Sequence, residues 1–458
     1  MTTSAPSNHP ITLIAGGTAE TPAPILTSMT NGASRRASGQ NGRTRRGDSA
    51  EWWAFPLRVW VIHWLLVQIP ATYALRFGTP NLPSPPYSEM PPPLTGLAHW
   101  IVEPLRNWDG LWYRLIALEG YAGGTQSAKA AFWPLLPGIM RGGNILTGWN
   151  VDTVGYFVAN VTFLGALLVM YRLISLDYGD VATARRAIWA LALFPTALFF
   201  SAVYTESLFL LLTVSALYLW RRDMIWLAGL VSIGAALSRS GGIFLIPPFL
   251  ALLWDRHRRD WRGYWPGIIP AFFPALGPAI FAGILYREQE NWNAFIDVQV
   301  QWNRYSAAPW ETLRCAVVTC HELGGEPDGV SWTWWTDLWQ NPSWSTITST
   351  AWRNDFANSD VLELVVTVLF LLLVLVGLKV LPFYLTVWVL PGLLIPLLQP
   401  SQVHALMSTP RFVLVLFPLF IVLGKLIQPT VIRIPWYIVS VLLLVVLTAQ
   451  FALWYWVS

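Results

Sequence analysis

The sequence DVLELVVTVLFLLLVLVGL, residues 360–378, decides the class of fold. It is apolar apart from two acidic residues near its beginning and one threonine. A helix needs about 17–25 mainly apolar residues to cross a bilayer, so this run predicts a membrane span. The sequence therefore predicts an all-α polytopic membrane protein with about eleven transmembrane helices. The other runs are residues 57–77, 152–171, 186–203, 206–220, 224–238, 242–254, 266–286, 381–398, 411–424 and 434–457. The runs 206–220 and 242–254 are shorter than a full crossing.

The composition agrees with this class and excludes a soluble protein. Of the 458 residues 54% are hydrophobic and only 12% are charged, whereas soluble domains carry about 25% charged residues. The 28 tryptophans gather near the ends of apolar runs and in connectors, where indole rings settle at a membrane–water boundary.

Residues 1–50 differ from the rest of the chain. They are rich in small polar residues and carry a basic patch at residues 35–46. Their apolar content is too low to form a core, so we expect a disordered cytoplasmic tail before a membrane domain at residues 51–458. A basic patch can also bind nucleic acid, but its place beside a first span favours a cytoplasmic anchor, and no nucleic-acid partner is predicted.

Basic residues orient the predicted spans. The connector DRHRRDWR at residues 255–262 is strongly basic, and the other connectors on its side also carry Lys or Arg. Such connectors remain in the cytoplasm. This orientation places two long connectors, residues 78–150 and 287–359, outside the cytoplasm. It also gathers unusual polar groups on that outer side, so we expect an extracytoplasmic active site.

The first outer connector contains NWDGLWYRLIALEGY, residues 107–121, followed by AAFWPLLPGIMR, residues 130–141. Asp109 follows Trp108, and a partly desolvated carboxylate beside aromatic rings suits general-base chemistry. The alternative is that Asp109 only caps a helix that ends at Gly120. We expect residues 97–112 to form an amphipathic interfacial piece. Tyr113 and Tyr121, together with Trp108, are candidates for substrate binding.

Four more polar residues stand out on the predicted outer side. Glu206 lies between two apolar runs, where it either binds substrate or sits in a solvated turn. Arg239 could bind a phosphate, or it could simply pair with an acid such as Glu206. His404 and Arg411 pose the same choice. Two arginines and a histidine around an acid predict a site for an anionic headgroup.

The second outer connector adds hydrogen-bonding groups and the two cysteines of the chain. Gln301 and Asn303, in QVQWNRY at residues 299–305, are of the kind that bind sugars. Cys315 and Cys320 could form a disulfide in an oxidising compartment, or remain free thiols. Together with His321 they lack a fourth metal ligand, so no metal is predicted.

Three kinds of protein remain open on residue chemistry alone. The chain has no P-loop, G-x-S-x-G or H-E-x-x-H motif, which argues against nucleotide hydrolysis. A transporter or flippase of a lipid-linked sugar would place polar groups near the bilayer midplane in repeated halves. In a non-enzymatic scaffold the acidic residues and arginines on the outer side would have no function. The gathering of polar groups at one membrane edge favours an enzyme.

The motifs resemble one family. WDGLWYRLIALEGY with AAFWPLLPGIMR is similar to the signature of the PIG-V mannosyltransferases, the second mannosyltransferase of GPI-anchor synthesis and its bacterial relatives. FPTALFFSAVYTESLF at residues 194–209 and LSRSGG at residues 237–242 resemble the next two blocks, and HALMSTPRF at residues 404–412 is a looser match. The bacterial relatives are the more similar, which implies the plasma membrane, or the endoplasmic reticulum membrane in a eukaryote.

The resemblance implies a GT-C membrane glycosyltransferase. Such enzymes transfer a hexose, here mannose, from a polyprenyl-phosphate or dolichyl-phosphate donor to a lipid or protein acceptor with inversion. They carry an acidic residue in the first outer loop as the base, and Asp109 matches that position. Arg239 and Arg411 are our own candidates for the donor phosphate. The implied partners are the donor, a glycolipid or protein acceptor and membrane lipids, and no cofactor is expected.

Overall fold

The fold is seen in a computed structural model, which describes residues 34–81, 91–122, 127–257, 261–317, 340, 343 and 359–457. Of residues 34–50, 261–263 and 359 it describes the backbone alone. The chain divides into two units, Met1–Ala50 and Glu51–Ser458. Helix α1 (Ser34–Phe77) begins inside the first unit. Residues 1–33 lie outside the described residues, and the disordered basic tail over residues 1–50 stays a prediction.

The second unit is built from helices, which confirms the all-α polytopic class. Apart from one isolated bridge between Arg304 and Ser401, the described residues contain no β-structure. After α1 the α-helices are α2 (Leu97–Ile101), α3 (Asp109–Glu119), α4 (Leu135–Thr147), α5 (Val151–Tyr178), α6 (Val181–Ala192), α7 (Glu206–Arg221), α8 (Ile225–Ser238), α9 (Ile246–His257), α10 (Trp261–Ala271), α11 (Leu276–Gln289), α12 (Ala294–Asp297), α13 (Pro309–Val317), α17 (Ser359–Val380), α18 (Phe383–Leu398), α19 (Thr409–Leu414), α20 (Phe417–Leu426) and α21 (Thr430–Ala452). Short 3-10 helices join them at η1 (Glu103–Leu105), η2 (Ala128–Ala131), η3 (Ala197–Phe200), η4 (Ser240–Leu245), η5 (Phe273–Ala275) and η6 (Val298–Trp302).

Helices occur at every predicted apolar run, but only some are long enough to cross a bilayer. By length and composition, five in the described part of the chain qualify: Glu51–Phe77, Val151–Tyr178, Tyr264–Gln289, Asp360–Val380 and Thr430–Ala452. The two runs expected to be short are α7, with 16 residues, and α9, with 12 residues. The total of about eleven spans stays a prediction.

Local sequence explains the tight reversal between α5 and α6. Gly179 ends α5 with a φ of 61°, a left-handed conformation that glycine adopts without strain. The next residue, Asp180, caps α6, because its carboxylate accepts two backbone N–H bonds from the first turn of that helix. Glycine followed by aspartate therefore turns the chain back within two residues.

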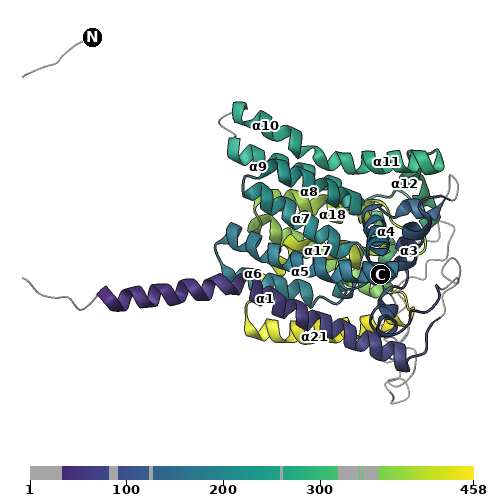
Figure 1. The fold of residues 1–458 in the computed structure, drawn as a ribbon, viewed down its shortest axis with the longest axis horizontal. Helices are drawn as coiled ribbons and strands as arrows, with labels where there is room; N and C mark the ends of the chain where they lie inside the picture. Colours follow the sequence, from purple (N-terminus) through teal and green to yellow (C-terminus); the bar gives the residue numbers. More distant parts are fainter. Residues whose placement is uncertain are drawn as a thin grey trace, which may run out of the picture. The chain divides into compact units, whose positions relative to one another are not determined.

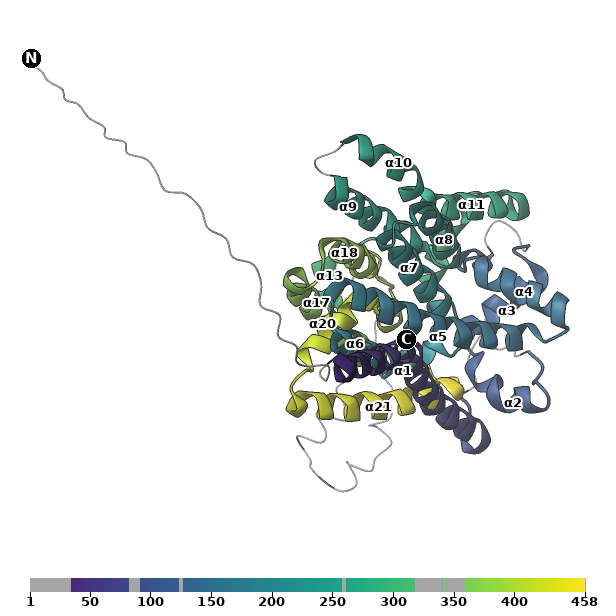
Figure 2. The same cartoon turned by 60° about the vertical axis from the view of Figure 1, so that its left-hand side comes forward.

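The helices pack around α7, which lies between α5 and α8. In both views α10 and α21 lie at opposite edges of the second unit, with α5, α7 and α8 between them (Figures 1 and 2). The centre is filled by aromatic rings, such as Phe163 stacked on Phe200 with centroids 4.4 Å apart. Close packing of this kind holds membrane helices together, because lipid is as apolar as the protein core.

One end of the second unit carries the short helices. Figure 1 shows α3, α4 and α12 at this end, whereas α9 and the first turns of α10 reach the other. The interfacial piece expected over residues 97–112 is not one helix, since α2, η1 and α3 divide it. The buried Arg106 explains the break, because its guanidinium donates to Asp152 Oδ2 at 2.7 Å and draws the chain inward.

Candidate active site

Asp109 is the first residue of α3, and it does not cap that helix. The N-cap is Trp108, and no side chain caps the helix there. The expectation that Gly120 ends the helix is confirmed, but the cap alternative for Asp109 is wrong. Asp109 is only 6% exposed, and its carboxylate pairs with Arg411. The backbone N–H of Asp109 donates to the Tyr204 hydroxyl at 3.1 Å.

Asp109 belongs to a chain of alternating charges. Arg411 donates to Asp109 Oδ2 at 2.5 Å, and its Nε lies 3.3 Å from Glu206 Oε1. The same Glu206 oxygen also pairs with Arg239. Glu206 is 1% exposed, so the solvated turn is wrong and the pairing with Arg239 is observed. Buried charges need such partners, because an unpaired charge in this environment is strongly unfavourable.

Four separate elements bring these charges together. Asp109 and Glu206 stand in the first turns of α3 and α7, where the helix dipole favours a carboxylate. Arg239 lies between α8 and η4, and Arg411 lies in α19. The ends of helices that are distant in sequence therefore meet at one point.

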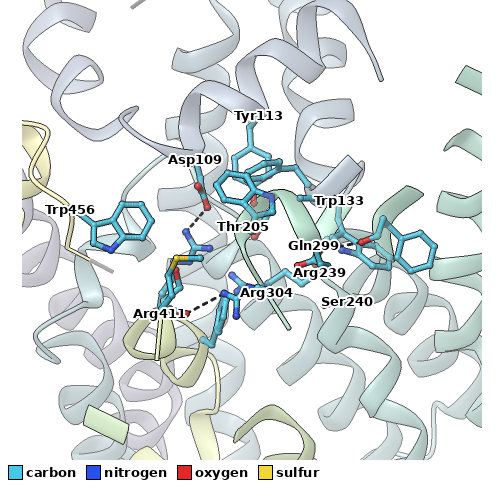
Figure 3. Close-up of a pocket in the computed structure, with 18 residues that line it drawn as sticks. Asp109, Tyr113, Trp133, Thr205, Arg239, Ser240, Gln299, Arg304, Arg411 and Trp456 are labelled. Carbon is cyan, nitrogen blue, oxygen red and sulfur yellow. Dashed lines mark hydrogen bonds and ion pairs between the residues drawn. The ribbon is translucent and has the colours of Figure 1, made fainter. Parts of the chain in front are cut away.

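A cavity of about 210 Å³ opens beside this charge chain. Figure 3 shows Asp109 facing Arg411, with Arg239 and Arg304 beyond that pair. Three arginines and one carboxylate line the cavity, so it attracts an anion. The lining residues are Asp109, Tyr113, Ala131, Phe132, Trp133, Thr205, Ser238, Arg239, Ser240, Phe295, Gln299, Trp302, Arg304, Met407, Ser408, Arg411, Phe412 and Trp456.

Arg304 is the cation that sequence reasoning missed. It donates to the carbonyls of Gln399 at 2.7 Å and Met407 at 3.3 Å, and it makes no ion pair within the described residues. Burial, together with the neighbouring Arg411 charge, lowers the pKa of Arg304 to about 10, so it is charged at neutral pH. Its position depends on the tertiary contact between residues 303–305 and 398–402, which no local pattern shows.

The predicted aromatic residues have different places. Tyr113 lines the cavity, with its hydroxyl 3.4 Å from Thr205 Oγ1. Burial and the nearby carboxylates of Glu206 and Asp109 raise the pKa of Tyr113 well above its usual value, so it is neutral. Tyr121 is not in the wall, because its hydroxyl donates to the Phe132 carbonyl at 2.6 Å. Trp108 is also outside the wall and packs on other tryptophans.

Gln301, Asn303 and His404, which we predicted to bind substrate, do not line the cavity. Gln301 and Asn303 are exposed, and His404 hydrogen-bonds Asp360 with Nδ1 2.7 Å from Oδ1. Gln299 and Trp302 face the cavity instead. The reason is the 3-10 helix η6, in which residues three apart share a face. The sequence signal for Gln299 and Trp302 was their three-residue spacing within QVQWNRY, residues 299–305.

Two further expectations remain open. Cys315 lies in α13, but Cys320 is outside the described residues, so their pairing stays a prediction. No group of His, Cys, Asp and Glu in the described part of the chain could hold a metal ion. The expectation of a metal-free and cofactor-free reaction stays a prediction as well.

Comparison with known sequences identifies relatives of the part of the chain that contains Asp109. A family described as Mannosyltransferase (PIG-V) matches residues 54–246. The chain is 33% identical over 150 residues to GPI mannosyltransferase 2 of Cryptococcus neoformans var. neoformans serotype D, in strains JEC21 and B-3501A. That match covers 31% of this chain and 35% of each relative, so the chain spans about a third of the length of the relatives it matches.

The matched region contains Asp109, Glu206 and Arg239, whereas Arg304 and Arg411 lie beyond it. The resemblance predicted from the motifs is therefore confirmed, because residues 54–246 of this integral membrane protein match the PIG-V mannosyltransferase family.

Proposed function

We propose that the chain is an integral-membrane mannosyltransferase that takes mannose from a polyprenyl-phosphate donor on the extracytoplasmic side. One observation carries the proposal: Asp109, inside the family-matched region, lines a cavity whose other charged wall residues are three arginines. A carboxylate can accept a proton, and the arginines suit a phosphodiester. The aromatic wall suits a sugar and the start of a lipid chain.

The reaction follows from this arrangement. Asp109 takes the proton of an acceptor hydroxyl, and the hydroxyl oxygen attacks the anomeric carbon of mannose from the face opposite the phosphate. The bond between that carbon and the phosphate oxygen breaks, and the configuration inverts. The electron pair leaves with the lipid phosphate, which becomes a phosphate monoester. Arg304 and Arg411 stabilise the charge that develops on the leaving group.

Asp109 and Arg411 form an ion pair in the wall of the cavity. The donor phosphate competes for Arg411, because two anions share one guanidinium. Movement of Arg411 toward the phosphate frees the Asp109 carboxylate for the acceptor proton. Glu206 remains as the second carboxylate partner of Arg411 and keeps it near the cavity.

The acceptor is a lipid or protein hydroxyl, and the enzyme lies in the plasma membrane, or in the endoplasmic reticulum membrane of a eukaryote. The rival function is a flippase of the lipid-linked sugar. A flippase places its polar groups near the midplane, whereas the charged wall here lies among the short helices at one end of the second unit.

The test is Asp109→Asn in protein reconstituted with radiolabelled polyprenyl-phosphate mannose and membrane lipids. Asparagine still accepts a hydrogen bond from Arg411 but is not a base, so we expect transfer to fall about 10²–10⁴-fold. Glu119→Gln is the matched control, since Glu119 lies on the same helix and pairs with Lys129 outside the cavity.

Two results would overturn the proposal. If folded Asp109→Asn transfers mannose at the wild-type rate, Asp109 is not the base. If wild-type protein moves the labelled donor across the bilayer unchanged and forms no product, the chain is a flippase.

A further inference from the structure

The segment that follows α21, residues 453–457, contributes an aromatic side chain to the cavity wall. In residues 453–457, Trp454 is 9% exposed and Val457 is buried. Trp456 is half-buried and lines the same cavity as Asp109. A segment with such burial is part of the packed fold, unlike a frayed helix end.

Asn107 ties this segment to the start of α3. Its side-chain amide donates to the carbonyls of Phe451 at 2.9 Å and Ala452 at 3.2 Å. The last carbonyls of a helix have no partner within the helix, so the amide satisfies groups at the end of α21. The Asn107 carbonyl accepts a bond from the Tyr204 hydroxyl, whose oxygen accepts the N–H of Asp109. One residue thus connects the end of α21 to the backbone of the proposed base.

The end of α1 holds the segment from another side. The backbone N–H of Asn81 donates to the Leu453 carbonyl at 2.7 Å. Gly78 lies so close to Leu453 that a Cβ at this position would be 2.6 Å from its side chain. The approach therefore needs a residue without a side chain, and it fixes Leu453 before the chain reaches Trp456.

Trp108 completes the arrangement. Its ring centroid lies 5.9 Å from that of Trp454 and 5.1 Å from that of Trp456. Its backbone has φ 56° and ψ −118°, a conformation that costs a residue with a side chain appreciable energy. Strain of this kind persists where the surrounding packing enforces it, and here it sits directly before Asp109.

We propose that residues 453–457 are part of the active site and that Trp456 contacts the acceptor substrate; the inference rests on the proposed function. Figure 3 shows Trp456 on one side of the Asp109–Arg411 pair, and Arg239 and Arg304 on the other. The arginine side holds the donor phosphate. Asp109 receives the acceptor proton, so the side of Trp456 is the acceptor half.

The indole N–H of Trp456 supports this assignment. Trp456 Nε1 is buried and has no hydrogen-bond partner among the described residues. A buried donor is unfavourable unless water or a ligand supplies an acceptor. An acceptor oxygen in the cavity meets this need, and the indole face covers the apolar side of the same molecule.

The experiment compares two reactions of the full chain in lipid nanodiscs, each with radiolabelled polyprenyl-phosphate mannose. The first has no added acceptor and measures slow hydrolysis of the donor by water. The second adds a total membrane lipid extract at increasing concentration and measures label in lipid product. For Trp456→Ala we expect the half-saturating extract concentration to rise about tenfold, and the ratio of lipid transfer to donor hydrolysis at low extract concentration to fall by a similar factor.

Two further variants complete the design. Trp456→Phe keeps an aromatic ring beside Trp108 but lacks the N–H donor, so its half-saturating concentration should lie between those of wild type and Trp456→Ala. Tyr455→Ala is the matched control, because Tyr455 is the exposed neighbour and does not line the cavity. It should behave as wild type in both reactions. Thermal unfolding verifies that each variant is folded.

The inference fails if Trp456→Ala leaves lipid transfer unchanged, or if it weakens hydrolysis and transfer equally, which would put Trp456 on the donor side. If Trp456→Ala does not fold, a wild-type value for Trp456→Phe overturns the inference instead. Failure of the proposed function looks different: wild-type protein then yields labelled mannose in neither reaction, and the inference falls with it.

Discussion

At the scale of single residues, the site is defined by how its charges are shared. Arg411 pairs with two carboxylates, and Arg239 pairs with one of them, whereas Arg304 hydrogen-bonds carbonyl oxygens and forms no ion pair with any described residue. A guanidinium that holds no carboxylate is the one most available to an incoming anion. We therefore expect Arg304 to contribute more to donor affinity than to stability.

Replacing Arg304 tests this expectation. Arg304→Gln removes a charge from the cavity without leaving a carboxylate unpaired in the described part of the chain. The donor KM should rise about 10–100-fold, the usual worth of a charge-assisted hydrogen bond, while the thermal unfolding temperature changes little. Arg287→Gln is the control, since Arg287 is exposed and does not line the cavity. An unchanged donor KM with Arg304→Gln would contradict the assignment.

At the scale of elements, the turn formed by Arg239 and the start of η4 positions the Arg239 side chain, and two adjacent glycines in η4 differ in how closely they are packed. A Cβ on Gly242 would lie 2.3 Å from the backbone nitrogen of Ala236, which cannot move without disturbing α8. A Cβ on Gly241 would meet only the ring of Phe209, at an ordinary 3.5 Å. The sequence LSRSGG does not show which glycine is required, because the difference lies in the helix that each one faces.

Alanine at each position therefore tests this difference. Gly242→Ala should lower the unfolding temperature and reduce transfer, since the clash displaces the turn that carries Arg239, with a cost of about 1–3 kcal/mol. Gly241→Ala should be near wild type in both measurements. Equal effects of the two substitutions would show that the turn is not closely packed against α8.

The elements also show why part of the site escaped sequence reasoning. Asp109, Glu206, Arg239 and Arg411 could be proposed because each is a charge beside an apolar run, which is rare in membrane proteins. Gln301 and Asn303 were chosen by residue type, but the 3-10 turn of η6 points Gln299 and Trp302 into the cavity. The pairing of Arg239 with Glu206 was one of the alternatives that the sequence offered, whereas the pairing of Arg411 with Asp109 was hidden, because only the assembled helices bring these two residues together.

At the scale of the whole molecule, hydropathy predicted the helical class and the position of each apolar run. It could not predict how many runs cross the bilayer, because α6, α7, α8 and α9 are shorter than a full span. Their length depends on where the chain breaks into 3-10 turns, and those breaks make tertiary contacts such as the bond from the Val203 N–H, between η3 and α7, to the Leu105 carbonyl at 2.9 Å.

Orientation in the membrane gives a prediction at this scale. Thr147 ends α4, which packs against α3 and α5 beside the site, whereas α7 starts at the site and runs about 24 Å to its other end, near Arg222. In a variant with Cys315 and Cys320 changed to serine, an impermeant maleimide should label Thr147→Cys in intact cells. Arg222→Cys should react only after the cells are lysed. The reverse labelling would place the candidate active site in the cytoplasm.

The double contact of Arg411 has a consequence for the order of events. This arginine neutralises the proposed base, so an acceptor that binds before the donor meets a carboxylate already paired with a cation. Binding of an anion to Arg411 would release the Asp109 carboxylate. The protein should therefore bind its substrates in a compulsory order, with the charged lipid donor first and the acceptor hydroxyl second. An acceptor that binds without the donor should not react.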